Sequence, residues 1–162
     1  MLKKYTWLAV AIVLLTFVMF VSSVTALELD EASRTVSQNE RGDAIVMSTK
    51  QLVNGKKQFN YACSSCHGQG MTKTNPNVGL DLETLSLATP PRDNIQGLVD
   101  FLQIPKSFDG EVDISEYHPG IKSADVFPKM RNMTEDDLVD LAGYMLAQPR
   151  IESRWAAGKG AR

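Results

Sequence analysis

The most constraining feature of this 162-residue chain is the run Cys63-Ser64-Ser65-Cys66-His67, which holds both of its cysteines. This C-x-x-C-H pattern is typical of the attachment of a c-type haem. The two thiols stand three positions apart on one helical turn, so each can add to a vinyl group at the same porphyrin edge. The imidazole of the next residue then reaches the iron. The pattern therefore predicts one covalently bound haem c, with Cys63 and Cys66 as thioether residues and His67 as an iron ligand.

Three other uses of a C-x-x-C pair fit this sequence less well. A thioredoxin-like dithiol follows a strand in a βαβ pattern, whereas a helical pattern precedes Cys63. A zinc site needs four ligands, and this chain would have to combine both cysteines with His67 and His118 without finger-like spacing. A disulfide between Cys63 and Cys66 would close a very small, strained loop.

The N-terminal segment has the pattern of a secretory signal. Lys3 and Lys4 precede an apolar run over residues 7–21, and small residues follow as far as Ala26. An uncleaved membrane anchor is the alternative, but it needs about 20 apolar residues, more than this run provides. We expect cleavage after Ala26, so that the domain of residues 27–162 works outside the compartment of synthesis. Losing two lysines and no acid changes the formal charge from −2 to −4, which gives no reason to expect nucleic-acid binding.

The rest of the chain predicts a mainly helical domain with little sheet. The N-terminal arm, residues 27–47, has turn residues at 39–42 and is typical of a short β-hairpin. Helical patterns cover 49–62, 83–88 and, after Asp93 as the expected cap, 94–104; residues 105–133 are irregular. The clearest helix begins at Thr134, before the acids of residues 135–137, and is expected to end at Pro149. A mobile C-terminal tail is expected over 150–162.

The helical spacing also predicts which faces are buried. The helix before the motif buries one face and the C-terminal helix buries another, and a large apolar cofactor gives the loop-rich region between them something to pack against. The expected buried positions are Leu52, Gly55, Phe59 and Ala62 in the first helix and Leu138, Leu141, Ala142 and Met145 in the last.

The second axial ligand remains open on the residues alone. His118 is the only other histidine, and methionines are the usual alternative. Met71 lies too near the attachment site, and Met133 and Met145 fit core positions. Met130, shortly before the C-terminal helix, is the rival to His118.

The chain resembles the class I cytochromes c. The resemblance lies in a helix that leads into the C-x-x-C-H motif and a C-terminal helix expected to cross it near Gly55, Phe59 and Tyr144. Members of that class commonly carry their ligating methionine in a Met-Pro pair before the acidic-capped helix. Here the corresponding pair is Phe127-Pro128, and phenylalanine cannot bind iron.

More specifically, residues 49–149 resemble the extrinsic low-potential cytochrome c of photosystem II. In that family the second axial ligand is the histidine before a proline, so the resemblance implies ligation by His67 and His118. It also implies a small class I helical fold around one haem. The arm and the end of the tail match poorly. The matching segments are 61–67, 72–76, 88–95, 118–119 and 123–132.

The resemblance further implies a role and a location. Family members lie on the lumenal side of the thylakoid membrane of cyanobacteria or algal plastids. There they contact the core proteins and other extrinsic subunits of photosystem II. They support oxygen evolution by stabilising the manganese–calcium cluster and its calcium and chloride environment, with electron transfer as a further duty. Two protein ligands leave no open iron position, which argues against a haem enzyme. A freely diffusing electron carrier is the remaining alternative.

Overall fold

The computed structural model describes residues 29–156. The predicted signal segment and its cleavage point after Ala26 lie outside these residues. None of the helices within 29–156 is long and apolar enough to cross a membrane. In chain order the elements are α2 (Glu31–Arg34), β1 (Thr35–Ser37), β2 (Ala44–Val46), α3 (Thr49–Ala62), η1 (Gly68–Gly70), α4 (Leu82–Ser86), α5 (Ile95–Gln103), η2 (Pro128–Met130) and α6 (Glu135–Ile151).

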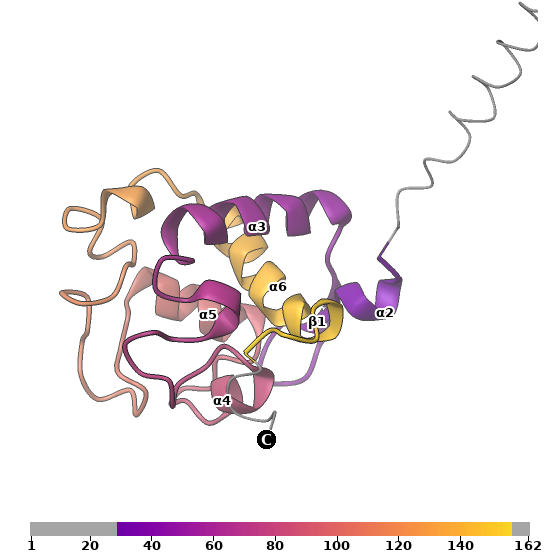
Figure 1. Cartoon of the computed structure of the whole chain (residues 1–162), viewed down its shortest axis with the longest axis horizontal. Coiled ribbons are helices and arrows are strands. Elements are labelled where there is room, and N and C mark those ends of the chain that lie inside the picture. The colour runs from indigo at the N-terminus through magenta and orange to yellow at the C-terminus, as the bar shows by residue number, and fades with distance from the viewer. Residues whose placement is uncertain (1–28, 157–162) are drawn as a thin grey trace, which may run out of the picture.

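The centre of the fold is the crossing of α3 and α6 (Figure 1). Each helix begins with a capping box, built by Ser48 with Gln51 and by Thr134 with Asp137. At the crossing, a Cβ on Gly55 would lie 2.0 Å from the carbonyl oxygen of Asp140, so only glycine permits this approach. The buried positions predicted for both helices are confirmed, and they bring the end of α3, where the cysteine motif starts, onto the core.

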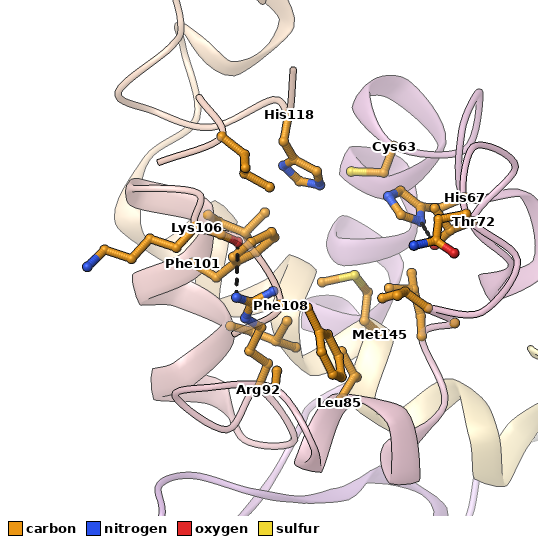
Figure 2. Close-up of a pocket in the computed structure, with 18 of the residues that line it drawn as sticks. Cys63, His67, Thr72, Leu85, Arg92, Phe101, Lys106, Phe108, His118 and Met145 are labelled. Carbon is orange, nitrogen blue, oxygen red and sulfur yellow. Dashed lines mark hydrogen bonds between the residues drawn. The ribbon is translucent and has the colours of Figure 1, made fainter. Parts of the chain in front are cut away.

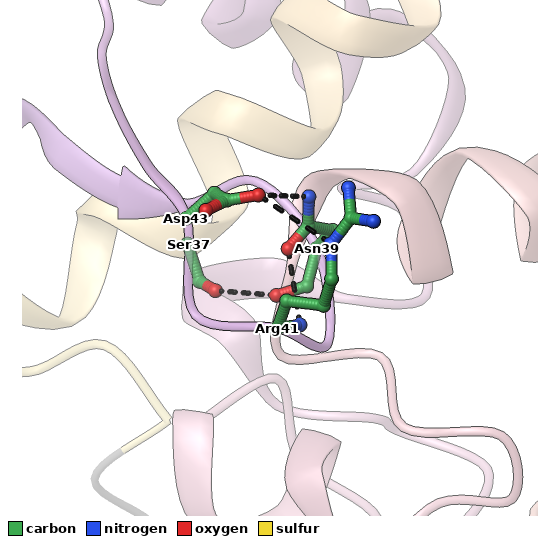
Figure 3. Close-up of polar contacts among 4 residues, drawn as sticks. All are labelled: Ser37, Asn39, Arg41 and Asp43. Atoms are coloured by element: carbon green, nitrogen blue, oxygen red, sulfur yellow. Dashed lines mark hydrogen bonds and ion pairs between the residues drawn. The ribbon is translucent and has the colours of Figure 1, made fainter.

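The predicted hairpin is confirmed as an antiparallel pair in which Val36 is opposite Ile45. Its turn is held by short-range polar contacts (Figure 3). The Asn39 amide donates to Asp43 (2.9 Å), and the backbone N–H of Arg41 donates to the Asn39 side chain (3.0 Å). Gly42 closes the turn with a φ of +82°. The hairpin packs on α6 and forms no part of the cavity described below.

Helices α4 and α5 follow the predicted order with two corrections. The α4 helix covers Leu82–Ser86, one residue earlier at its start and two earlier at its end than expected. The cap of α5 is Asn94 and not Asp93, because the Asn94 side chain accepts the backbone N–H of Gly97 (2.9 Å). Helix α5 packs against α6, and the long loop after it contains only the short turn η2 before α6.

The end of the described chain departs from the prediction. Helix α6 continues through Pro149 to Ile151, since the N–H of Glu152 still donates to the carbonyl of Gln148 beyond the proline. The expectation of a mobile tail is wrong for residues 150–156, because Trp155 is only 7% exposed. Its ring packs against Phe59 and Tyr144, with centroids 5.2 and 5.9 Å away. Residues 157–162 lie outside the described part.

Candidate haem site

A cavity of about 320 Å³ lies between the end of α3, helix α5 and the loops that follow them (Figure 2). Cys63 and His67 line it from the motif, and His118 lines it from the loop after α5. The rest of the wall is mostly apolar, as suits a flat apolar cofactor. The apolar wall residues include Val78, Leu80, Leu85, Leu98, Leu102, Phe108, Ile114 and Met145.

His67 enters the cavity from the turn that follows α3. Its backbone N–H donates to the carbonyl of Cys63 (2.9 Å), which continues the helical path of the motif past the end of α3. Its Nδ1 lies 3.1 Å from the hydroxyl oxygen of Thr72. Burial lowers the pKa of His67, so the imidazole is held neutral. A neutral ring with Nδ1 engaged leaves Nε2 as the donor atom for a metal.

His118 enters from the opposite wall, in the loop between α5 and η2. Its Nδ1 lies 2.8 Å from the carbonyl oxygen of Pro119, which can only accept, so Nδ1 carries the proton. The hydroxyl of Ser123 donates to the carbonyl of His118 (3.1 Å), which fixes the backbone here. Burial, followed by the charge of His67, lowers the pKa of His118 to about 4. Nε2 is again left as a free lone pair.

The two predicted axial ligands face each other across the cavity. Their ring centroids are 5.9 Å apart and the rings are inclined by 54°. Figure 2 shows both imidazoles at one end of the cavity, with Cys63 between them. Phe101 of α5 supports the second ring edge-on, with centroids 4.8 Å apart. The arrangement leaves a space between two neutral imidazoles that fits one metal atom.

The two cysteines lie beside the histidines and are not joined in a disulfide. Cys63 is half-buried at the cavity wall, where burial raises the pKa of its thiol to about 12. Cys66 is exposed and is not part of the wall. Within residues 29–156, no three His, Cys, Asp or Glu side chains gather as a metal cluster, so the zinc alternative finds no four-ligand site. Free thiols beside facing imidazoles and an apolar cavity fit a covalently attached haem.

The methionines considered as the second iron ligand lie in different surroundings from His118. Met130, the rival ligand, is fully buried in the helical core and does not line the cavity. Met71 is 42% exposed, and Met133 lies in a groove beside Ile104 and Leu138. Met145 is a core residue as expected, but it also forms part of the cavity wall. The structure therefore brings His118, and not Met130, to face His67.

Sequence reasoning missed the residues around the ligands. Thr72 contacts the imidazole of His67, and Phe101 contacts that of His118. Arg92 reaches the cavity wall and lies 4.1 Å from the ring centroid of Phe101. Thr72 and Arg92 lie in segments of the sequence that match the resembled family, and this match could have pointed to them. No rule of sequence spacing connects either residue to the site.

Comparison with known proteins gives the family of this chain. The cytochrome c-550 domain family matches residues 27–162. Photosystem II extrinsic protein V from Nostoc punctiforme is 54% identical over 160 residues, covering 98% of each chain. The protein of that name from Porphyra purpurea is 52% identical with the same coverage. The crystal structure of cytochrome c549 matches with a TM-score of 0.76 and 52% identity, covering 78% of this chain and 99% of that one.

A mainly helical fold with one small antiparallel sheet and a cavity for an attached haem defines a class I cytochrome c. The predicted fold class and the single covalent haem c are thereby confirmed. The chain belongs to the cytochrome c-550 family. This is the family that the sequence resembles.

Proposed function

We propose that this chain is a haem-bearing extrinsic subunit of photosystem II. The observation that carries the proposal is the match over nearly the whole chain to relatives named Photosystem II extrinsic protein V. In this role the protein binds peripherally on the lumenal side of the thylakoid membrane. It contacts core proteins and other extrinsic subunits there and supports oxygen evolution by stabilising the manganese–calcium cluster with its calcium and chloride.

The same proposal assigns the four site residues. Cys63 and Cys66 would hold the haem covalently, each thiol as a thioether to one vinyl group. His67 and His118 would bind the iron through Nε2. Their Nδ1 atoms keep their contacts with Thr72 and with the carbonyl of Pro119, which orient both rings.

Bound haem c supplies a one-electron couple at its iron. The protein tunes that couple through its ligands, since a second imidazole in place of a methionine thioether lowers the reduction potential. Two imidazole ligands would leave no open position on the iron for a substrate or dioxygen. The proposal is therefore a redox and structural subunit of a larger complex rather than an enzyme.

Salt washing of oxygen-evolving membranes tests the proposal. A docked subunit co-purifies with these membranes, leaves them at high ionic strength and restores oxygen evolution when added back at low calcium and chloride. The matched control is addition of a c-type cytochrome that binds iron through His and Met. A protein that is never retained by the membranes and has a clearly positive potential would instead be a freely diffusing carrier.

A further inference from the structure

Arg92 places a buried positive charge at the wall of the haem cavity. It lies on the segment before α5 and is only 7% exposed. Its Nη2 donates to the backbone carbonyls of Lys106 (3.1 Å) and Ser107 (2.6 Å), and its guanidinium lies over the ring of Phe101. Figure 2 shows the guanidinium at the far end of the cavity from Cys63. These contacts hold the guanidinium in one position.

This charge has no counter-ion among residues 29–156. The ion pairs of that part of the chain involve Arg41, Lys122 and Arg131. A buried cation is costly unless it is paired, and burial indeed lowers the pKa of Arg92. Removing water from a charge without a counter-ion is unusual in a folded protein, so the site fits an anion that residues 29–156 do not supply.

The guanidinium keeps hydrogen-bond donors for an anion. Both of its hydrogen bonds to the protein leave from Nη2, so Nη1 and Nε make none with the described residues. Each of these two nitrogens can donate a hydrogen bond to one oxygen of an anion such as a carboxylate, and a hydrogen bond between two charged groups is stronger than one between neutral groups. Lys106 is the other cation of the wall, but it is exposed and its side chain points away from the cavity (Figure 2).

We propose that Arg92 binds one of the two propionate carboxylates of haem c. This inference rests on the haem of the proposed function and is independent of docking to photosystem II. In a region of low dielectric the attraction between the buried cation and the carboxylate is strong, and it offsets part of the desolvation cost of both groups. The same guanidinium stacks on Phe101, which contacts His118, so Arg92 is also a positioning residue for the second axial ligand.

The test is the reduction potential of the purified, haem-loaded full chain at pH 8, in wild type, Arg92→Gln and Arg92→Lys. A positive charge near the iron disfavours the ferric state, so losing it lowers the potential. We expect a lower potential in Arg92→Gln and a value near wild type in Arg92→Lys.

The matched control is Arg34→Gln. The Arg34 guanidinium also donates to two backbone carbonyls, of Leu29 (3.0 Å) and Met47 (2.6 Å), but it does not line the cavity. We expect it to lower stability without moving the potential. Equal potentials in wild type, Arg92→Gln and Arg34→Gln would overturn the inference.

If Arg92→Gln does not fold, a crystal structure of the haem-loaded wild type decides. A carboxylate oxygen within about 3.2 Å of Nη1 or Nε supports the inference. Propionates that both lie beyond hydrogen-bond distance of Arg92 refute it. A purified protein without bound haem, or one that does not bind the membranes, would contradict the proposed function. Neither result depends on whether Arg92 binds a propionate.

Discussion

The ring of Trp155 occupies the place where a side chain on Gly70 would begin. A Cβ at position 70 would lie 2.7 Å from Cε2 of the indole, and Gly70 has a φ of +77°. The indole N–H donates to the carbonyl of Leu80 (3.0 Å), and the N–H of Ala156 donates to that of Gln69 (2.7 Å). Trp155 and Ala156 thus hold both ends of the loop of residues 69–80, which carries Thr72.

Gly70→Ala is expected to destabilise the protein by about 2 kcal/mol or more, because it combines a steric clash with an unfavourable φ. Urea unfolding followed by far-ultraviolet circular dichroism measures this. Gly68→Ala is the matched control, since a Cβ there meets nothing within 4 Å. Equal stability of the two variants would contradict the prediction, since it would mean that neither the clash with Trp155 nor the φ of +77° carries a cost.

The ionisation of Asp137 makes the stability of the fold depend on pH. Hydrogen bonds from the Asn54 side chain, the backbone of Thr134 and the Gln58 side chain hold the pKa of Asp137 at about 2, below its usual 3.8. The carboxylate therefore stabilises the fold fully above about pH 4, and this contribution is lost as the pH falls towards 2. Asp137→Asn should cost about 1 kcal/mol at pH 7, because it weakens the capping box of α6 and its charged hydrogen bonds, and less at pH 2.

Urea midpoints between pH 2 and 7 measure this difference. Asp136→Asn is the control, because Asp136 is an exposed neighbour in the same turn of α6. A difference between wild type and Asp137→Asn that stays constant over this range would contradict the prediction.

His118→Met tests the second axial ligand. The covalent haem should remain, because both cysteines are intact, while the potential rises towards that of cytochromes with His and Met ligands. The near-infrared and electron paramagnetic resonance spectra of the oxidised protein should change from imidazole to thioether ligation. Met130→Leu is the control and should leave both spectra and potential unaltered. If Met130→Leu changes them and His118→Met does not, the assignment is wrong.

Thr72→Val tests the support of the first ligand. A hydrogen bond accepted from Nδ1 makes an imidazole more electron-rich, so losing the Thr72 hydroxyl should raise the potential slightly without loss of haem. Thr74→Val is the control, because Thr74 also lines the cavity and makes no hydrogen bond with His67. A potential that moves equally in both variants would assign the effect to cavity polarity and not to the ligand.

Local patterns predicted much of this fold because their signals are local. The start of α6 at Thr134, the periodic faces of α3 and α6 and the turn at 39–42 all depend on residues close in sequence. The choice between Asp93 and Asn94 was ambiguous, since both are good caps and only the contact with Gly97 N–H decides. The end of α6 was missed because the last turn is held from elsewhere: Arg150 donates to the carbonyl of Thr35 (2.8 Å).

The candidate site likewise has a part that local sequence predicts and a part that depends on contacts between distant segments. The motif of residues 63–67 predicts its own chemistry, whereas the choice of His118 over Met130 needed the family resemblance. Thr72 and Phe101 approach the histidines, and Arg92 approaches Phe101, only when a loop and helix α5 fold together, and no spacing along the chain encodes that. Trp155 is an aromatic residue in an otherwise polar tail, and such a residue favours burial. It is buried in the structure, so the tail was wrongly expected to be mobile at this point.

The contact of Trp155 and Ala156 with residues 69–80 also sets an order of events during biosynthesis. These partners are separated by most of the domain, so they meet late, and long-range closures of this kind slow folding. Until residues 155 and 156 have been synthesised, these two contacts cannot close the loop of residues 69–80 that follows the haem-attachment motif. A chain shortened before Trp155 would lack the closing contacts altogether.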